Sequence, residues 1–191
     1  FEVEKAVTDN TKAIIPVHLN GRLCDMSQIE RIAIKNNLII IEDAAQAFGA
    51  SYQGKKAGNW GAMGCFSLHP MKVLNCSGDG GLITTNDSQL AQNLRSLRNH
   101  GQEVVGEFAH FGYSSRLDNL QAAFLNVKLQ KVDEWINRRR EIAGRYSSGF
   151  QDIPLVTPNP PSDREYFDVF NSYVVRTNRQ RDLVEYLRRE G

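Results

Sequence analysis

The sequence predicts an α/β fold of three layers, in which helices cover both faces of a mainly parallel sheet. Two observations predict it. Short apolar segments rich in β-branched residues alternate with segments whose apolar residues recur at helical spacing. In residues 13–41, a strand pattern, a helix pattern and a second strand pattern follow at the spacing of a βαβ unit. The strands of such a unit are parallel and are covered on both faces.

The first unit contains two strands and one helix. Residues 13–18 are apolar and β-branched, which is typical of a buried strand. Asp25 predicts the N-cap of a helix that ends at residues 36–37. Residues 38–41 form a second continuous apolar strand, and Asp43 stands just past its carboxyl end.

The middle of the chain predicts two more strands and a helix. Residues 51–61 contain three glycines and predict a turn-rich surface segment. Residues 64–68 and 80–85 predict short strands. Asn86 or Asp87 then caps a helix that carries leucines at helical spacing.

The second half predicts a loop, one long helix and a change of domain. Residues 102–114 form an irregular loop, and a single amphipathic helix covers residues 117–150. Prolines between residues 154 and 161 predict a domain boundary. Residues 170–176 predict a strand, and residues 180–190 predict a helix. The apolar stripe of the long helix consists of Leu120, Ala123, Phe124, Val127, Leu129, Val132, Trp135 and Ile136.

Two domains are therefore expected. Residues 1–150 form a large ligand-binding domain, and residues 151–191 form the start of a small α+β domain. Both ends of the chain look cut, because a patterned segment begins at once and the last helix has nothing to pack against. We expect further parts of both domains outside this chain.

Composition argues against several classes of function. The 191 residues carry 23 basic and 22 acidic side chains, so bulk charge favours neither nucleic acid nor an anionic membrane. The basic residues 138–140 stand beside Glu141 and read as a solvated helix face. The spacing of Cys24, Cys65 and Cys76 is typical of neither a metal site nor a disulfide framework, so we expect no metal site. Three unpaired cysteines suit a reducing cytoplasm. No apolar segment approaches the roughly 18 residues that span a bilayer.

Polar residues gather where the predicted strands end. Asp43 stands where open α/β sheets bind ligands, and Gln46 follows one helical turn later. The two side chains can therefore point into one site. A carboxylate at this position also commonly caps the following helix, so the local pattern leaves both roles open.

Lys72 follows the next strand end. Ser67 and His69 lie near the same end, and the glycine-rich residues 78–81 let the backbone approach a ligand. A lysine after a strand is usually solvated, and a glycine-rich segment is usually a turn, so it is the combination that indicates a site. The other lysines lie before the first strand, in turns or on helices; Lys128 and Lys131 are expected to face water from the long helix.

Several ordered motifs together resemble the DegT/DnrJ/EryC1/StrS family of sugar aminotransferases, which are pyridoxal-phosphate enzymes of fold type I. The resemblance covers nearly the whole chain. Its motifs are residues 16–21, 42–49, 64–67, 72, 78–81, 97–101, 112–118 and 121–123.

The resemblance implies a role for each site residue. Lys72 would bind the aldehyde of pyridoxal 5'-phosphate covalently and later move a proton between substrate and cofactor. Asp43 would pair with the pyridine nitrogen and keep it protonated. Gln46 would lie against the phenolic oxygen, and Ser67 would donate to the phosphate. His69 either lines the substrate pocket or braces the turn before the lysine.

Two positions depart from the family pattern. Ser114 stands where relatives usually have an asparagine that reaches the phosphate of the neighbouring subunit, and it has less reach. Val73 stands where relatives commonly have an asparagine. Both departures concern the affinity for the cofactor.

The implied reaction is amino transfer, usually from glutamate, to the ketone of a nucleotide-diphosphate sugar. The product would be an amino sugar for a surface polysaccharide or a glycosylated metabolite, and the enzyme would be a homodimer. One alternative is a pyridoxal-phosphate-dependent sugar dehydratase on the same scaffold; some such relatives have histidine in place of the lysine, so Lys72 favours transamination. Another is a non-catalytic sensor or structural homologue. A plain nucleotide-binding module is disfavoured, since neither a G-x-G-x-x-G motif nor a P-loop is present.

Overall fold

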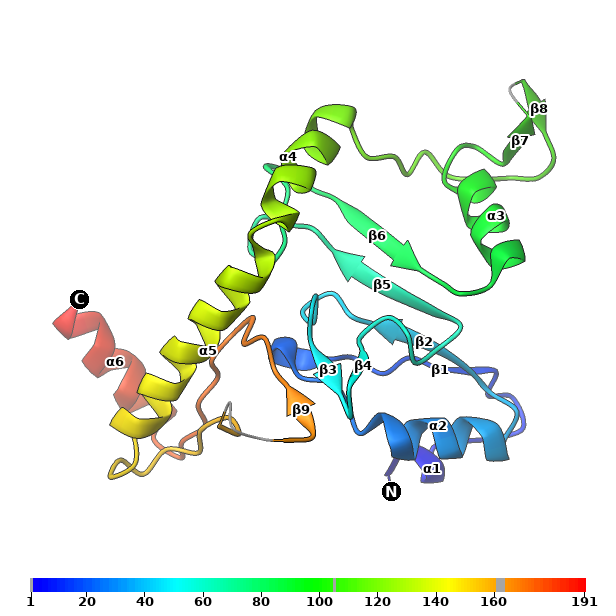
Figure 1. The fold of residues 1–191 in the computed structure, drawn as a ribbon. Helices are drawn as coiled ribbons and strands as arrows, with labels where there is room; N and C mark the ends of the chain where they lie inside the picture. The colour runs from blue at the N-terminus through cyan, green and yellow to red at the C-terminus, as the bar shows by residue number, and fades with distance from the viewer. Residues whose placement is uncertain (1, 105, 161–163) are drawn as a thin grey trace.

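The computed structural model describes residues 2–104, 106–160 and 164–191, and Figure 1 shows an α/β fold around a four-stranded sheet. The strand order is β1-β2-β5-β6, with β1, β2 and β5 parallel and β6 antiparallel to β5. The predicted α/β class and mainly parallel sheet are confirmed. The strands of this sheet are β1 (Ala13–Ile14), β2 (Ile39–Asp43), β5 (Met63–Ser67) and β6 (Gly81–Thr84).

The first strand is shorter than the sequence predicts. β1 ends at Ile14, and Pro16 has no amide hydrogen with which to continue the ladder. The carbonyl oxygen of Pro16 still accepts a hydrogen bond from the Asp43 amide at 3.0 Å, and Val17 forms an isolated bridge with Asp43. Residues 16–18 therefore follow β2 to its end without forming a regular strand.

The helices of the first half begin and end at the predicted signals. The Asp25 carboxylate accepts a hydrogen bond from the Gln28 amide at 3.0 Å, and Asn37 ends the helix with a φ of 52°. Asp87 caps the next helix through the amide of Gln89. The helical elements are α1 (Glu2–Lys5), the 3-10 turn η1 (Leu19–Gly21), α2 (Met26–Lys35), α3 (Ser88–Leu97), α4 (Asn119–Leu129), α5 (Val132–Gly149) and α6 (Gln180–Glu190).

The prediction of a turn-rich surface segment at residues 51–61 is only partly correct, because turns and bends make up residues 53–54 and 57–61 but two short strands lie between and before them. This segment forms a hairpin of β3 (Ser51–Tyr52) and β4 (Lys55–Lys56), and β9 (Tyr166–Phe167) pairs with β3 on its other side. Tyr52 is only 4% exposed, and its ring packs on that of Tyr166 at 4.5 Å. The hairpin joins the core because a segment more than 100 residues away supplies its third strand.

Two other segments also differ from prediction. Residues 102–114, expected to be irregular, contain a hairpin of β7 (Gln102–Val104) and β8 (Glu107–Phe108). Residues 170–176, expected to be a strand, form only an isolated bridge between Arg176 and Val156. The chain instead places its strand slightly earlier, at β9, where an open edge of the hairpin is available for pairing.

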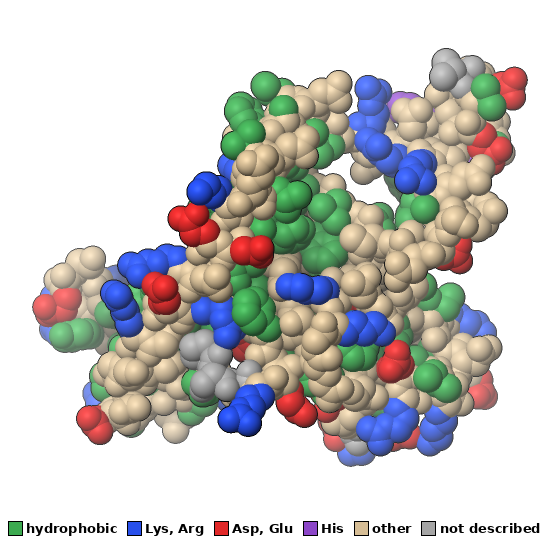
Figure 2. Space-filling view, in the orientation of Figure 1, with side chains coloured by type: hydrophobic (Ala, Val, Ile, Leu, Met, Phe, Trp, Pro, Cys, Tyr) green, Lys and Arg blue, Asp and Glu red, His purple; other side chains and the backbone are tan. Residues whose placement is uncertain are grey.

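The single long helix expected at residues 117–150 is two helices, α4 and α5, separated by two residues at 130–131. The break changes which face is buried. Leu125, which lies outside the predicted apolar stripe, is buried, whereas Leu120 and Val127 are exposed. Figure 2 shows apolar side chains exposed along the outer part of α4. The predicted stripe is therefore correct in α5, where Val132 and Ile136 are buried, and largely wrong in α4.

Residues after the proline-rich segment return to the main core. Val169 is fully buried in the same apolar cluster as Ile40 and Ile136. The Arg22 guanidinium binds the carboxylate of Asp168 at 2.7 Å. The division into a domain of residues 1–150 and a second one from 151 stays a prediction, and Pro161 lies outside the described residues.

The described residues lack two features that would suggest other functions. None of their helices has the length and apolar character to span a bilayer. Within the same ranges, no three histidine, cysteine or carboxylate side chains cluster as metal ligands. Cys24, Cys65 and Cys76 are free thiols.

Candidate active site

The carboxyl ends of two parallel strands bring the candidate residues to one edge of the sheet. β2 and β5 pair with Asp43 opposite Cys65, and the Ala44 amide donates to the Cys65 carbonyl at 2.9 Å. Ser67 lies two residues further along β5, so it shares a face of the sheet with Asp43 and Cys65. β6 starts at the same edge, where Gly81 pairs with Ser67. The structure therefore brings Asp43 and Ser67 to one place, as expected for strand ends.

The backbone of Asp43 is held on both sides. Its amide donates to Pro16 at 3.0 Å, and its carbonyl accepts from the amide of His18 at 3.0 Å. The side chain is half-buried, and its Oδ1 accepts from the Ala45 amide at 3.1 Å. Oδ2 receives no hydrogen bond from the described part of the chain. One carboxylate oxygen thus serves the local turn, while the other is left for a ligand.

A buried hydrogen-bonded pair lies directly behind this position. His18 and Glu42 have fully buried side chains, and Nε2 of His18 lies 3.0 Å from Oε2 of Glu42. Nδ1 of His18 accepts from the Cys24 amide at 3.3 Å, so the neutral ring carries its proton on Nε2 and donates it to Glu42. Sequence reasoning missed this pair; its one signal was a histidine at the end of an apolar segment.

Glu42 also organises the turn before β5. Its carboxylate accepts hydrogen bonds from the amides of Gly58 at 2.8 Å, Trp60 at 2.6 Å and Gly61 at 2.9 Å. Burial raises the pKa of the Glu42 carboxyl, but the bonds from His18 and the three amides outweigh burial, so its pKa lies below the ordinary value. Glu42 therefore stays ionised and ties three segments together behind Asp43.

Gln46 is oriented by a contact with the η1 turn. Its Oε1 accepts from the Asn20 amide at 2.7 Å. Asn20 has a φ of 60°, a left-handed conformation that asparagine tolerates better than most residues. Because the amide oxygen is used, the side-chain nitrogen is the group that Gln46 offers to a ligand, and that group is a hydrogen-bond donor.

Lys72 lies in the turn between β5 and β6. Its backbone amide donates to the His69 carbonyl at 2.9 Å, and the His69 amide donates to Oγ of Ser67 at 3.3 Å. Nδ1 of His69 accepts from the Met71 amide, so His69 braces the turn. The Lys72 side chain is half-buried, and within the described ranges its ammonium has neither a hydrogen bond nor an ion pair. A half-buried amine without a protein partner is free to bind a ligand.

The glycine-rich segment is needed for packing. A Cβ at Gly80 would lie 2.7 Å from Sγ of Cys76, and a Cβ at Gly81 would lie 3.1 Å from the carbonyl oxygen of Phe66. These glycines let the turn lie close against β5, so they carry no independent signal for a phosphate site.

Ser114 lines a cavity of about 800 Å³ beside β5, β6 and α3. Neither Asp43 nor Lys72 lines this cavity, although Cys65 and Gly81 do. Burial, followed by the negative charges of Asp43 and Glu42, raises the pKa of the Cys65 thiol. Figure 2 shows a hollow between α4 and the α3 side of the molecule, with basic side chains beside it. The arginines that line the cavity are Arg95, Arg98 and Arg116.

Comparison with known proteins agrees with the motifs. A profile described as the DegT/DnrJ/EryC1/StrS aminotransferase family matches residues 1–191. The chain is 42% identical to a "pleiotropic regulatory protein" of Geobacillus stearothermophilus over 100% of its own length and 51% of the relative. It is 41% identical to a dTDP-3-amino-3,4,6-trideoxy-alpha-D-glucose transaminase of Streptomyces venezuelae, over 99% of the chain and 50% of the relative.

A solved structure gives the same result for the fold. The S. venezuelae protein DesV, in complex with a ketimine intermediate, superposes with a TM-score of 0.93 at 40% identity, covering 98% of this chain and 50% of DesV. The chain thus spans about half the length of the relatives it matches. The resemblance found in the motifs, and the fold of type I, are confirmed.

Proposed function

The chain belongs to the DegT/DnrJ/EryC1/StrS aminotransferase family, and from this premise we propose that the whole protein is a pyridoxal-phosphate-dependent aminotransferase. It transfers an amino group, with glutamate as the expected donor, to a keto sugar linked to a nucleoside diphosphate. The observation that carries the proposal is the gathering of Asp43, Ser67 and the turn of Lys72 at one sheet edge.

The residues at this edge fit pyridoxal phosphate by their chemistry. The cofactor has an aldehyde, a phenolic oxygen, a basic ring nitrogen and a phosphate. The edge provides a free amine on Lys72, an amide donor on Gln46, a carboxylate oxygen on Asp43 and a hydroxyl on Ser67. Each group of the cofactor has a complementary partner, and Ser114 is proposed as a further phosphate ligand, at the site of a neighbouring subunit.

When bound, the cofactor supplies an electron sink that lets an amino group pass between a donor and a keto acceptor. Asp43, whose backbone is fixed on both sides, would hold the proton on the pyridine nitrogen. Gln46, whose Oε1 is bound by the Asn20 amide, would donate to the phenolic oxygen and so orient the ring. The Lys72 amine would hold the cofactor and would also serve as the base that moves a proton to and from the substrate carbon.

The acceptor and the assembly follow from the relatives. Among these, one is named as a dTDP-amino-sugar transaminase and another as a UDP-N-acetyl-3-dehydro-alpha-D-glucosamine 3-aminotransferase. We propose a nucleotide-linked keto sugar of this kind and a role in amino sugar biosynthesis. We also propose a homodimer, supported by the exposed apolar residues Leu120 and Val127 on α4, and a cytoplasmic enzyme, supported by its three free thiols.

A regulatory function is the second candidate, because one of the most similar relatives is named a pleiotropic regulatory protein. The two candidates differ in chemistry. An aminotransferase binds the cofactor through Lys72 and aminates a keto sugar, whereas a sensor without turnover does not aminate.

The test is a labelling experiment on the full-length protein. The purified protein is loaded with pyridoxal phosphate, its visible absorption is recorded, and it is reduced with borohydride and mapped by peptide analysis. We expect a yellow protein with the label on Lys72, and amination of at least one member of a panel of nucleotide keto sugars with glutamate as donor. A label on another lysine, or no label in a loaded protein, would refute the assignment of Lys72.

A further inference from the structure

Lys128 is a half-buried lysine in the last turn of α4, and its position contradicts the expectation that it faces water. Its ammonium donates to two oxygens of Asn75, the backbone carbonyl and the side-chain Oδ1, each at 2.8 Å. A lysine that leaves solvent must replace its lost hydration with such contacts. Lys128 is therefore committed to the turn that follows Lys72.

Asn75 connects this contact to Lys72. Because its Oδ1 binds the ammonium of Lys128, its Nδ2 is directed to the other side. Nδ2 donates to the backbone carbonyl of Lys72 at 2.8 Å. A continuous chain of hydrogen bonds thus runs from α4 through Asn75 to the backbone of the residue that would bind the cofactor.

The same face of α4 holds the turn at a second point. Oε1 of Gln121 accepts from the Ser77 amide at 2.9 Å. Gln121 precedes Lys128 by about two helical turns and so lies on the same face, with the buried Leu125 between them. From the opposite side, the Cys76 amide donates to the Leu68 carbonyl at 2.7 Å. The turn is consequently held between α4 and the residue that directly follows β5.

We propose that Lys128 is a positioning residue for Lys72, acting through Asn75, and that α4 serves as the support of the active-site turn. The inference rests on the proposed function of Lys72. A reactive amine on a turn keeps its geometry only when the backbone beneath it is fixed, and small displacements of a catalytic group reduce turnover strongly. Lys128 does not touch the substrate in this proposal; it controls where the Lys72 backbone lies.

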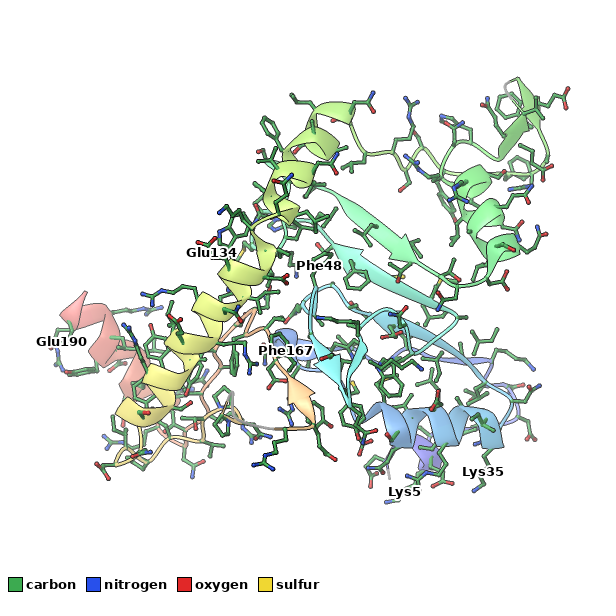
Figure 3. All side chains as sticks on the ribbon, viewed as in Figure 1. Lys5, Lys35, Phe48, Glu134, Phe167 and Glu190 are labelled. Atoms are coloured by element: carbon green, nitrogen blue, oxygen red, sulfur yellow. The ribbon has the colours of Figure 1, made fainter. Side chains whose placement is uncertain are left out.

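The test compares Lys128→Met with Lys131→Met in the full-length, cofactor-loaded enzyme. Methionine keeps the length of the side chain and the helix propensity but removes the donors. Lys131 is a matched control, since among the described residues its ammonium pairs with Glu134 alone, at 3.3 Å, and both side chains are more than 60% exposed. Figure 3 shows Glu134 on the side of α5 away from the sheet.

We expect Lys128→Met to lower kcat by between about 10- and 100-fold, with KM for the donor nearly unchanged. Borohydride labelling of Lys72 should slow, and the pH at which the visible band of the bound cofactor titrates should shift. Lys131→Met should match the wild type in kcat, KM, labelling rate and titration of the visible band. Lys128→Arg restores a cationic donor, so its kcat should lie between those of Lys128→Met and the wild type.

Asn75→Asp provides a second route if Lys128→Met fails to fold. The carboxylate keeps the contact with Lys128 but cannot donate to the Lys72 carbonyl, so kcat should fall as in Lys128→Met. The positioning role would be overturned if Asn75→Asp kept wild-type kcat and wild-type labelling of Lys72. It would also be overturned if Lys128→Met kept both and showed only a lower Tm. A wild-type protein without a label on Lys72 would instead refute the proposed function itself.

Discussion

The buried pair of His18 and Glu42 supports the end of β2, and Glu42→Gln tests how much the site depends on it. Glutamine has nearly the same volume but only one acceptor oxygen. That oxygen can still bind the amides of Trp60 and Gly61. The new amide nitrogen would then face two donors, the Gly58 amide and Nε2 of His18, which now lie 2.8 Å and 3.0 Å from Oε2.

The expected cost follows from these contacts. Each buried donor that loses its acceptor costs about 1–3 kcal/mol, and Glu42→Gln leaves two such donors, the Gly58 amide and Nε2 of His18. We expect Glu42→Gln to reduce the free energy of unfolding by about 2–6 kcal/mol, measured by urea denaturation of the full-length protein at pH 7. Glu134→Gln, which breaks an exposed pair with Lys131, should cost less than about 1 kcal/mol.

The pH dependence gives an independent check. The pKa of Glu42 is lower in the folded state than its ordinary value of 4.5, so its contribution to stability is complete above that value and is lost as the pH falls through the folded-state pKa. Wild-type stability should therefore decrease below about pH 4.5 more steeply than that of Glu42→Gln. Equal stability of the two proteins at pH 7, together with equal pH profiles, would refute the role of the pair.

Two further predictions concern the site and its packing. Asp43→Asn should keep its circular dichroism spectrum but lose at least about 100-fold in kcat, because a neutral amide does not keep the ring nitrogen protonated; near-normal turnover would exclude this role. Gly64→Ala should cost at least about 1–3 kcal/mol in denaturation experiments, since a Cβ there would lie 2.3 Å from Cα of Gly58. At Gly149 the new Cβ would meet no described atom within 4 Å apart from its chain neighbours and the backbone of its own helix, so Gly149→Ala should cost nothing. Equal losses in the two variants would contradict the packing argument.

Local signals were sufficient for part of the fold and indicated which polar residues stand at strand ends. The caps at Asp25 and Asp87 and the apolar run of β2 are decided by interactions within a few residues of one another, so they are readable from sequence. Asp43 and Ser67 were placed at one edge because parallel strands end there. The resemblance to the family rested on ordered motifs, and the comparisons confirm it.

Only the tertiary structure decided how distant segments support these residues. Glu42 meets His18 across 24 positions, and Lys128 meets Asn75 across 53. Nothing local distinguishes Lys128 from Lys131, because both are lysines on a helical pattern. Their surroundings differ because the chain breaks between α4 and α5 and turns a different face toward the sheet. Periodicity shows that a helix has an apolar face. It does not show which polar side chains are buried beside that face, because this depends on the path of the connecting segments. Those paths are fixed only when the whole core packs.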